Sequence, residues 1–114
     1  MPDSNPIPRI VLTTASNLDE ANSLACVLVE EHLAACVSII PAIQSVYRWQ
    51  GNVESATEVL MLIKSGPNQL AALESRLLQL HSYETPEFLV LPVESASHPY
   101  LEWLHASLRP DSGS

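Results

Sequence analysis

The chain has 114 residues, which is enough for one domain with a hydrophobic core and leaves little room for a second. It is 46% hydrophobic but only 16% charged, which excludes a disordered chain and favours a subunit that covers part of its surface with copies of itself. Thirteen acidic residues against five basic ones give a net charge of -8, so neither nucleic acid nor an anionic membrane is predicted as a partner.

Residues 1–8 and 109–114 are rich in Pro, Ser, Gly and Asp, so we expect two flexible tails around a single domain at residues 9–108. The N-terminal segment lacks the apolar run of a signal peptide, and no apolar stretch approaches the ~20 residues that cross a bilayer. Cys26 and Cys36 are the only cysteines, and we expect both to be buried thiols in a reducing compartment. The sequence therefore predicts a cytoplasmic protein.

The first half of the chain predicts a strand, a helix and a long hairpin. Residues 10–14 form a short β-branched run typical of a buried strand. Asn17 with Glu20 three residues later is typical of a capping box, and apolar residues then recur at helical spacing, which predicts a helix over residues 18–33.

Two long strands follow, at residues 35–49 and 53–65. Gly51 and Asn52 are expected to form the turn between them. Pro41 removes a hydrogen-bond donor from the first of these strands, so we expect the hairpin to bend there.

The second half of the chain predicts a helix, a strand and a short helix. Pro67 suits the first position of a helix whose apolar stripe consists of the leucines at 70, 73, 77 and 80. A fourth strand is expected at residues 88–93, with Pro92 placing it at a sheet edge, and a short helix is expected to begin near residue 97. This order is that of the α+β, ferredoxin-like split βαβ fold, an antiparallel sheet with two helices on one face.

One face of this sheet is predicted to lack cover. Glu58, Leu60, Leu62 and Lys64 point to one side of their strand, and the apolar residues between them point to the other. Both faces are therefore apolar at the centre, and the face without helices requires a partner, which we expect to be a second copy of the chain.

Residues 81–87 form the densest polar cluster. Imidazole and carboxylate are good ligands for copper and zinc, so His81 and Glu87 are candidate metal ligands. A structural alternative is equally open, in which His81 ends the second helix, Pro86 stops it and Tyr83 packs on the core. No motif of a hydrolase, redox enzyme or phosphate-binding loop is present, so the sequence predicts no catalytic residue and no required cofactor.

Charged and aromatic side chains of the hairpin allow two interpretations each. Glu58 and Lys64 either form the rim of a ligand cleft between subunits or make ion pairs that fix the register of the assembly. Trp49 and Tyr47, on one side of their strand, either fill an interface or stack on a ligand.

Residues spread in order over positions 9–108 resemble the CutA family of divalent-cation tolerance proteins. They are Leu33-Ala34-Ala35-Cys36, Ile40-Pro41, Trp49, Gly51, Glu58, Lys64, His81, Tyr83, Pro86-Glu87, Tyr100-Leu101 and Trp103. The resemblance implies a ferredoxin-like subunit in a homotrimer, with hairpins that continue the sheets across subunits, and no established enzymatic activity. It also implies binding of copper or other divalent ions in some members, and a subunit cleft formed by residues matching Trp49, Glu58, Lys64, His81 and Tyr83.

The sequence departs from copper-binding relatives in the first strand, where a cysteine can occur and this chain has Thr13 and Thr14. A thiolate suits Cu(I), so its absence argues against tight copper binding. The leading hypothesis is a trimeric, non-enzymatic protein that binds Cu(II) or Zn(II) through His81 and Glu87 and contributes to metal tolerance. The alternatives are a PII-like signalling module that holds a small anion with Lys64, and a small enzyme with Glu58 or His81 as base.

Overall fold

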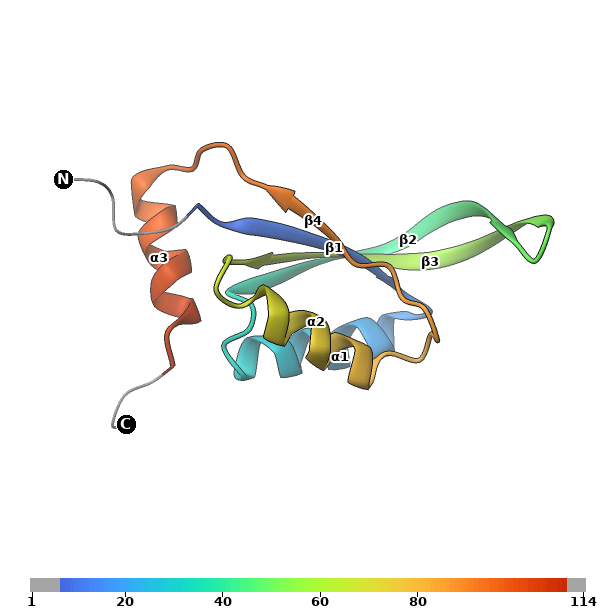
Figure 1. Ribbon diagram of the computed structural model, residues 1–114, viewed down its shortest axis with the longest axis horizontal. Helices are drawn as coiled ribbons and strands as arrows, with labels where there is room; N and C mark the ends of the chain where they lie inside the picture. The colour runs from blue at the N-terminus through green and yellow to red at the C-terminus, as the bar shows by residue number, and fades with distance from the viewer. Residues whose placement is uncertain (1–6, 111–114) are drawn as a thin grey trace.

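The computed structural model describes residues 7–110, so most of the two expected tails lies outside the described residues. Seven elements follow one another along the chain (Figure 1). They are β1 (Arg9–Ala15), α1 (Leu18–Glu30), β2 (Cys36–Trp49), β3 (Asn52–Ser65), α2 (Leu70–Leu80), β4 (Leu89–Pro92) and α3 (His98–Leu108).

The four strands form one antiparallel sheet in the order β2-β3-β1-β4. Helices α1 and α2 lie on one face of the sheet, α3 lies across the end at which β1 begins, and the β2–β3 hairpin extends beyond the helices at the opposite end (Figure 1). The molecule is accordingly long, measuring 53 × 31 × 22 Å. This is the predicted ferredoxin-like split βαβ fold, and the predicted α+β class is confirmed.

Helix α1 begins at the predicted residue and ends earlier than predicted. Asn17 Oδ1 accepts a hydrogen bond from the Glu20 amide at 2.8 Å, as a capping residue does. The Glu20 carboxylate binds the Ser16 amide at 3.0 Å rather than the amide of Asn17, so the reciprocal half of the capping box is displaced by one residue. The helix ends at Glu30 because His32 adopts a φ of 61°, which reverses the chain.

The β2–β3 hairpin has the predicted bend and a turn one residue earlier than predicted. The pairing register shifts between Ile40 and Ile43, which places a bulge at Pro41. Gln50 and Gly51 have φ values of 50° and 84°, both positive as in a type I′ turn. Asn52 already pairs with Trp49, so the prediction of a Gly51–Asn52 turn is wrong by one residue.

Helix α2 begins at Leu70, so the prediction that Pro67 is its first residue is wrong. Pro67 lies instead in a turn closed by a hydrogen bond of 3.1 Å from the Gln69 amide to the Gly66 carbonyl. Strand β4 pairs only with β1 and forms the sheet edge, as Pro92 indicated. Helix α3 has its proline in the first turn, as expected.

The main core lies between the sheet and the pair α1 and α2. Its fully or almost fully buried members are Val11, Ala15, Ala21, Leu24, Leu28, Ala34, Val59, Met61, Ile63, Leu73 and Leu77. The sheet residues among them alternate with residues of the opposite face, because successive side chains of a strand point to opposite sides. This packing fixes which face of the sheet remains open.

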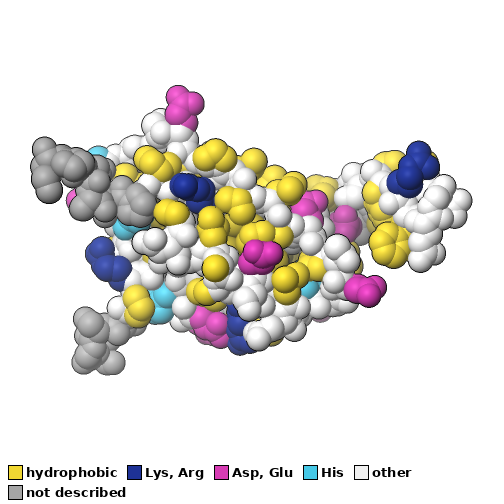
Figure 2. Space-filling view, viewed as in Figure 1, with side chains coloured by type: hydrophobic (Ala, Val, Ile, Leu, Met, Phe, Trp, Pro, Cys, Tyr) yellow, Lys and Arg dark blue, Asp and Glu magenta, His cyan; other side chains and the backbone are white. Residues whose placement is uncertain are grey.

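The opposite face of the sheet is apolar, and no helix among the described residues covers it; we call it the open face. It brings together Leu12, Ile40, Leu60, Leu62, Leu89 and Leu91. Ile40, Leu89 and Leu91 remain 42%, 53% and 44% exposed. Hydrophobic side chains also gather over the sheet in the space-filling view (Figure 2). The apolar second face agrees with the expectation from the sequence.

No helix within residues 7–110 is long and apolar enough to cross a membrane. The two cysteines differ from expectation, because Cys26 is exposed on α1 and Cys36 is only half-buried, next to the Tyr100 hydroxyl at 3.8 Å. The prediction that both are buried thiols is therefore wrong.

Candidate functional site

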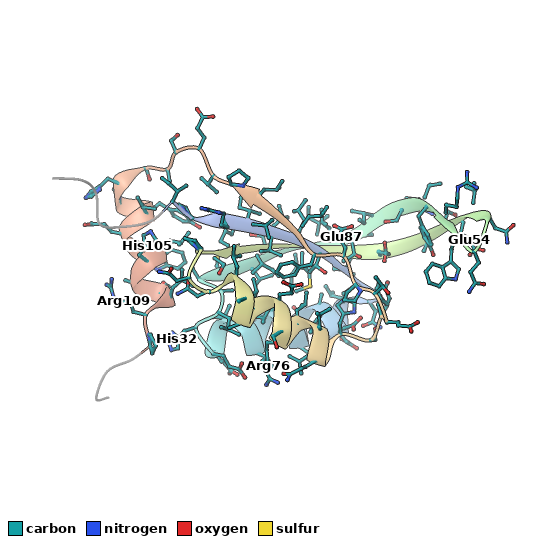
Figure 3. All side chains as sticks on the ribbon, in the orientation of Figure 1. His32, Glu54, Arg76, Glu87, His105 and Arg109 are labelled. Carbon is teal, nitrogen blue, oxygen red and sulfur yellow. The ribbon has the colours of Figure 1, made fainter. Side chains whose placement is uncertain are left out.

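A cleft of about 650 Å³ opens where the hairpin leaves the body of the sheet. The ends of β2 and β3 form one wall, and the loop between α2 and β4 forms the other. Its aromatic and acidic lining consists of Tyr47, Trp49, Glu58, Tyr83, Glu84 and Glu87. Glu87 lies at the base of the hairpin and Glu54 lies near its tip (Figure 3), and acidic side chains are visible at this narrow part of the surface (Figure 2).

The bulge in β2 decides which side chains face this cleft. Beyond it, Ile43 pairs with Glu58, and residues two apart on each strand share a face. Tyr47 and Trp49 therefore lie on the same side as Glu58. Without the extra residue near Pro41 these rings would point to the other side of the hairpin.

Tyr83 links the two walls of the cleft. Its hydroxyl donates a hydrogen bond of 2.7 Å to Glu58 Oε2. Burial raises the pKa of Tyr83, and the hydrogen bond to Glu58 and the charge of that carboxylate raise it further. The phenol therefore remains a protonated donor. The pKa of Glu87 is also raised, mainly by burial and to a smaller extent by the negative charge of Glu58. The two carboxylates therefore repel one another across the cleft.

His81 supports the cleft from behind. Its side chain is fully buried, Nε2 lies 2.7 Å from the Thr14 carbonyl, and Nδ1 accepts the Tyr83 amide hydrogen at 3.0 Å. An amide can only donate, so Nδ1 is unprotonated and Nε2 carries the proton that it donates to Thr14. Both ring nitrogens of His81 are therefore engaged within the chain, and the ring packs at 4.7 Å from that of Tyr83.

Glu20 holds the same loop from the other side. Its Oε2 accepts the Ser82 amide at 2.8 Å and its Oε1 accepts the Ser16 amide, while Nδ1 of His81 lies 3.7 Å away. Burial alone would raise the pKa of Glu20, but the hydrogen bonds from Ser16 and Ser82 outweigh it and lower the pKa to about 2. The sequence predicts only a capping role for Glu20, because no local pattern links it to Ser82, 62 residues further along the chain.

Four of the residues predicted from the sequence come together in the cleft: Trp49, Glu58, Tyr83 and Glu87. Lys64 does not, because it lies six residues from Glu58 on the same strand face, roughly 20 Å away at the rise of a β-strand. Its Nζ donates to Ser38 Oγ at 2.5 Å. An anionic ligand in the cleft of one chain would therefore meet carboxylates rather than this ammonium group.

The two residues predicted to hold an ion, His81 and Glu87, occupy different positions relative to the cleft. His81 does not line the cleft, whereas Glu87 does. No group of three or more His, Cys, Asp or Glu side chains within residues 7–110 is arranged to hold a metal ion. Tyr47, for which the sequence left stacking on a ligand and filling an interface open, also lines the cleft, and so does Glu84, which the sequence placed only within the polar cluster.

These features define a class of protein: a ferredoxin-like α+β subunit with one open sheet face, a long bent hairpin and an acidic, aromatic cleft at the base of that hairpin. Residues 9–107 match the family model described as CutA1 divalent ion tolerance protein. The chain belongs to the CutA family, and the resemblance noted in the sequence is confirmed.

Relatives of known name or structure match most of the chain. The divalent-cation tolerance protein CutA of Pectobacterium atrosepticum is 48% identical over 100 residues, which are 88% of this chain and 91% of that protein. The chloroplastic protein CutA of Arabidopsis thaliana is 42% identical over 93% of this chain and 59% of its own length. The structure titled periplasmic divalent cation tolerance protein CutA from Archaeoglobus fulgidus has a TM-score of 0.88 and 33% identity, covering 90% of this chain and all of that one.

Proposed function

We propose that this chain is a non-enzymatic, cytoplasmic, homotrimeric protein that binds divalent metal ions, copper or zinc, and contributes to metal-ion tolerance. Several relatives are named for divalent-cation tolerance. A low content of charged residues and an apolar open face support self-association. No cofactor is required for this role, because the cation is the ligand rather than a resident group.

The observation that carries the cation-binding role is the acidic lining of one cleft, to which Glu58, Glu84 and Glu87 contribute without forming a three-ligand group. The charge of Glu58 contributes to the raised pKa of Glu87, so a cation placed between them relieves repulsion. Carboxylate oxygens bind Zn(II) and Cu(II), and Glu87 is the ligand expected from the sequence. His81 joins it only when the Tyr83 amide is released from Nδ1.

Thermal unfolding with and without added Zn(II) or Cu(II) tests the proposal. We expect a metal-dependent rise of the Tm in the wild type, because an ion that binds only the folded state stabilises it. The rise is expected to be lost in Glu87→Gln and kept in the control Glu94→Gln, an exposed position outside the cleft. Identical melting curves with and without metal would contradict the proposal.

His81→Ala separates a ligand from a structural support. If His81 is a ligand, it contributes to the metal-dependent rise of the Tm, and we expect that rise to disappear in the variant. If His81 is only a structural support, it stabilises the fold equally with and without metal. The Tm of the variant would then be lower under both conditions, and the difference between the two Tm values would be unchanged. The second result would assign the ion to the carboxylates and remove His81 from the site.

A further inference from the structure

We propose that α3 is a lid over the start of β2 and the end of β3, and that it opens as one unit while the sheet and the other two helices stay folded. The helix lies across the end of the sheet at which β1 begins (Figure 1). The motion takes place within one chain, and it requires neither a metal ion nor a second copy.

The packing under α3 is separate from the main core. Leu104 and Leu108 of α3 are almost fully buried, and they form a small apolar cluster with Ala35, which directly precedes β2. Among the described residues, none from α3 belongs to the main core between the sheet and the pair α1 and α2. A segment with few buried contacts opens at a lower free energy than a continuous core, so α3 can open before the sheet does.

The turn after α1 holds the C-terminal end of α3. Nδ1 of the half-buried His32 lies 3.2 Å from the carbonyl oxygen of Ser107, in the last turn of α3, and His32 is labelled beside this end of the helix in Figure 3. A carbonyl can only accept, so Nδ1 donates the hydrogen bond. The carbonyls of the last turn have no partner inside the helix, so His32 caps α3. The same residue ends α1 with its φ of 61°.

The turn between β3 and α2 lets α3 approach the backbone closely. Gly66 is buried, and a Cβ atom added there would lie 3.2 Å from Cδ1 of Leu108 and 2.9 Å from Oε1 of Gln69. The flexible Gln69 side chain can move away, whereas Leu108 is held in the small cluster under α3. Glycine is therefore the residue that allows the helix to rest on this turn.

The N-terminal end of α3 is held less firmly. Residues 94–97, which connect β4 to the helix, are exposed, and Ser97 makes no capping hydrogen bond with its side chain. Near this end the Tyr100 hydroxyl lies 3.8 Å from the sulfur of Cys36. Opening of the lid about this link would uncover Ala35 and separate Tyr100 from Cys36. The lid would thus control access to the thiol of β2.

Hydrogen exchange measured by mass spectrometry tests the lid in the native chain. We expect the amides of α3 to exchange at least about tenfold faster than those of β1 and β3, with both halves of α3 responding together. Leu108→Ala and Leu24→Ala are matched variants, because each truncates an almost fully buried leucine, one under α3 and one in the main core. Leu108→Ala is expected to quicken exchange in α3 at least about tenfold, and Leu24→Ala is expected to leave α3 unchanged.

Two further variants test the turns that hold the lid. His32→Asn keeps a residue that tolerates a positive φ but is too short to reach Ser107. Gly66→Ala adds the methyl group that meets Leu108. Each is expected to quicken exchange in α3 severalfold and to leave β1 unchanged.

A buried thiol gives an independent measurement of the opening. Ala35→Cys, in a chain that also carries Cys26→Ser and Cys36→Ser, places the only thiol of the chain under α3. We expect it to react with iodoacetamide more slowly than a free thiol. Leu108→Ala is expected to raise this rate by the same factor as the exchange of the α3 amides.

Three results would overturn the lid. One is an α3 that exchanges as slowly as β1 and β3. Another is an α3 that Leu24→Ala quickens as much as Leu108→Ala does, because the helix would then open only when the whole chain unfolds. The third is exchange in α3 that quickens on dilution of the protein, because a neighbouring copy rather than this chain would then hold the helix in place.

Discussion

At the scale of single residues, the cleft depends on two side chains that do not line it. Glu20 and His81 bind the backbone of Ser82 and Tyr83, and Tyr83 in turn holds Glu58. The sequence indicated a capping box for Glu20, whose carboxylate binds the amide of Ser16 instead of that of Asn17, and a helix end for His81, which is the C-cap residue of α2. Their second role arises from the contact between the β1–α1 and α2–β4 loops, which local sequence patterns do not encode.

Glu20→Gln tests this support through the pH dependence of stability. The pKa of Glu20 is about 2 in the folded state against an ordinary 4.5, so its ionised form stabilises the fold above about pH 4.5. That contribution is lost as the pH falls from 4.5 towards 2. We expect Glu20→Gln to be less stable than the wild type at pH 7 and the two stabilities to converge near pH 2.

Urea unfolding at several pH values between 2 and 7 measures this convergence. The variant Glu94→Gln, at an exposed carboxylate on the loop before α3, is expected to follow the wild-type curve throughout. A difference between Glu20→Gln and wild type that stays constant from pH 7 to pH 2 would contradict the assigned role.

The composition of the cleft was only partly predictable. Resemblance to the CutA family supplied Trp49, Glu58 and Tyr83, and the metal-ligand chemistry of residues 81–87 supplied Glu87. The resemblance also included Lys64, which shares a strand face with Glu58, but alternation gives only the face and not the distance along it. The engagement of both His81 nitrogens also depends on tertiary contacts, so sequence left its ligand and structural roles equally open.

At the scale of elements, strand and helix types followed from periodicity, whereas their ends depended on backbone conformation. Helix α1 stops early because His32 takes a left-handed conformation that a residue other than glycine rarely shows. Helix α2 starts late because Pro67 and its neighbours form a separate turn. Neither departure alters the sheet order, since the apolar alternation of β2 and β3 fixes which face packs under the helices.

The hairpin turn gives a prediction at this scale. Gly51 has a φ of 84° and open space where a Cβ atom would lie, so Gly51→Ala carries only the conformational cost, about 1–2 kcal/mol. Gln50→Asn creates the Asn-Gly pair that type I′ turns prefer, and we expect it to stabilise the turn. Amide hydrogen exchange near Val53 and Arg48 is expected to quicken in the first variant and slow in the second.

Hydrogen exchange is preferred to global unfolding because the hairpin tip can open without the core. Amides of the core strand β1 serve as the internal control and are expected to exchange at the wild-type rate in both variants. Equal protection of the hairpin amides in all three proteins would rule out the type I′ assignment.

At the scale of the whole molecule, the apolar open face accounts for the low content of charged residues, because the proposed assembly would bury this face between subunits. Leu62 lies at the centre of this face, paired with Leu12 on one side and Ser38 on the other. We expect Leu62→Glu to place an unpaired charge in the interface and to shift the protein from the mass of three chains to that of one. Sedimentation equilibrium measures the change, with Leu78→Glu on the exposed side of α2 as the matched control.

A wild-type chain that sediments with the mass of one subunit would contradict the homotrimer. A Leu62→Glu variant that retains the wild-type mass would instead place the interface elsewhere on the molecule. Both outcomes leave the fold itself unchanged, because Leu62 lies on the face opposite to the main core.

The position of β1 in the sheet also has a consequence for synthesis of the chain. This strand lies between β3 and β4, yet it leaves the ribosome before both of them. Its apolar residues and both of its hydrogen-bonding edges therefore remain without their final partners until most of the chain has been made. The hairpin pairs with itself as soon as it emerges, whereas the first strand is the segment most exposed to premature contacts between nascent chains.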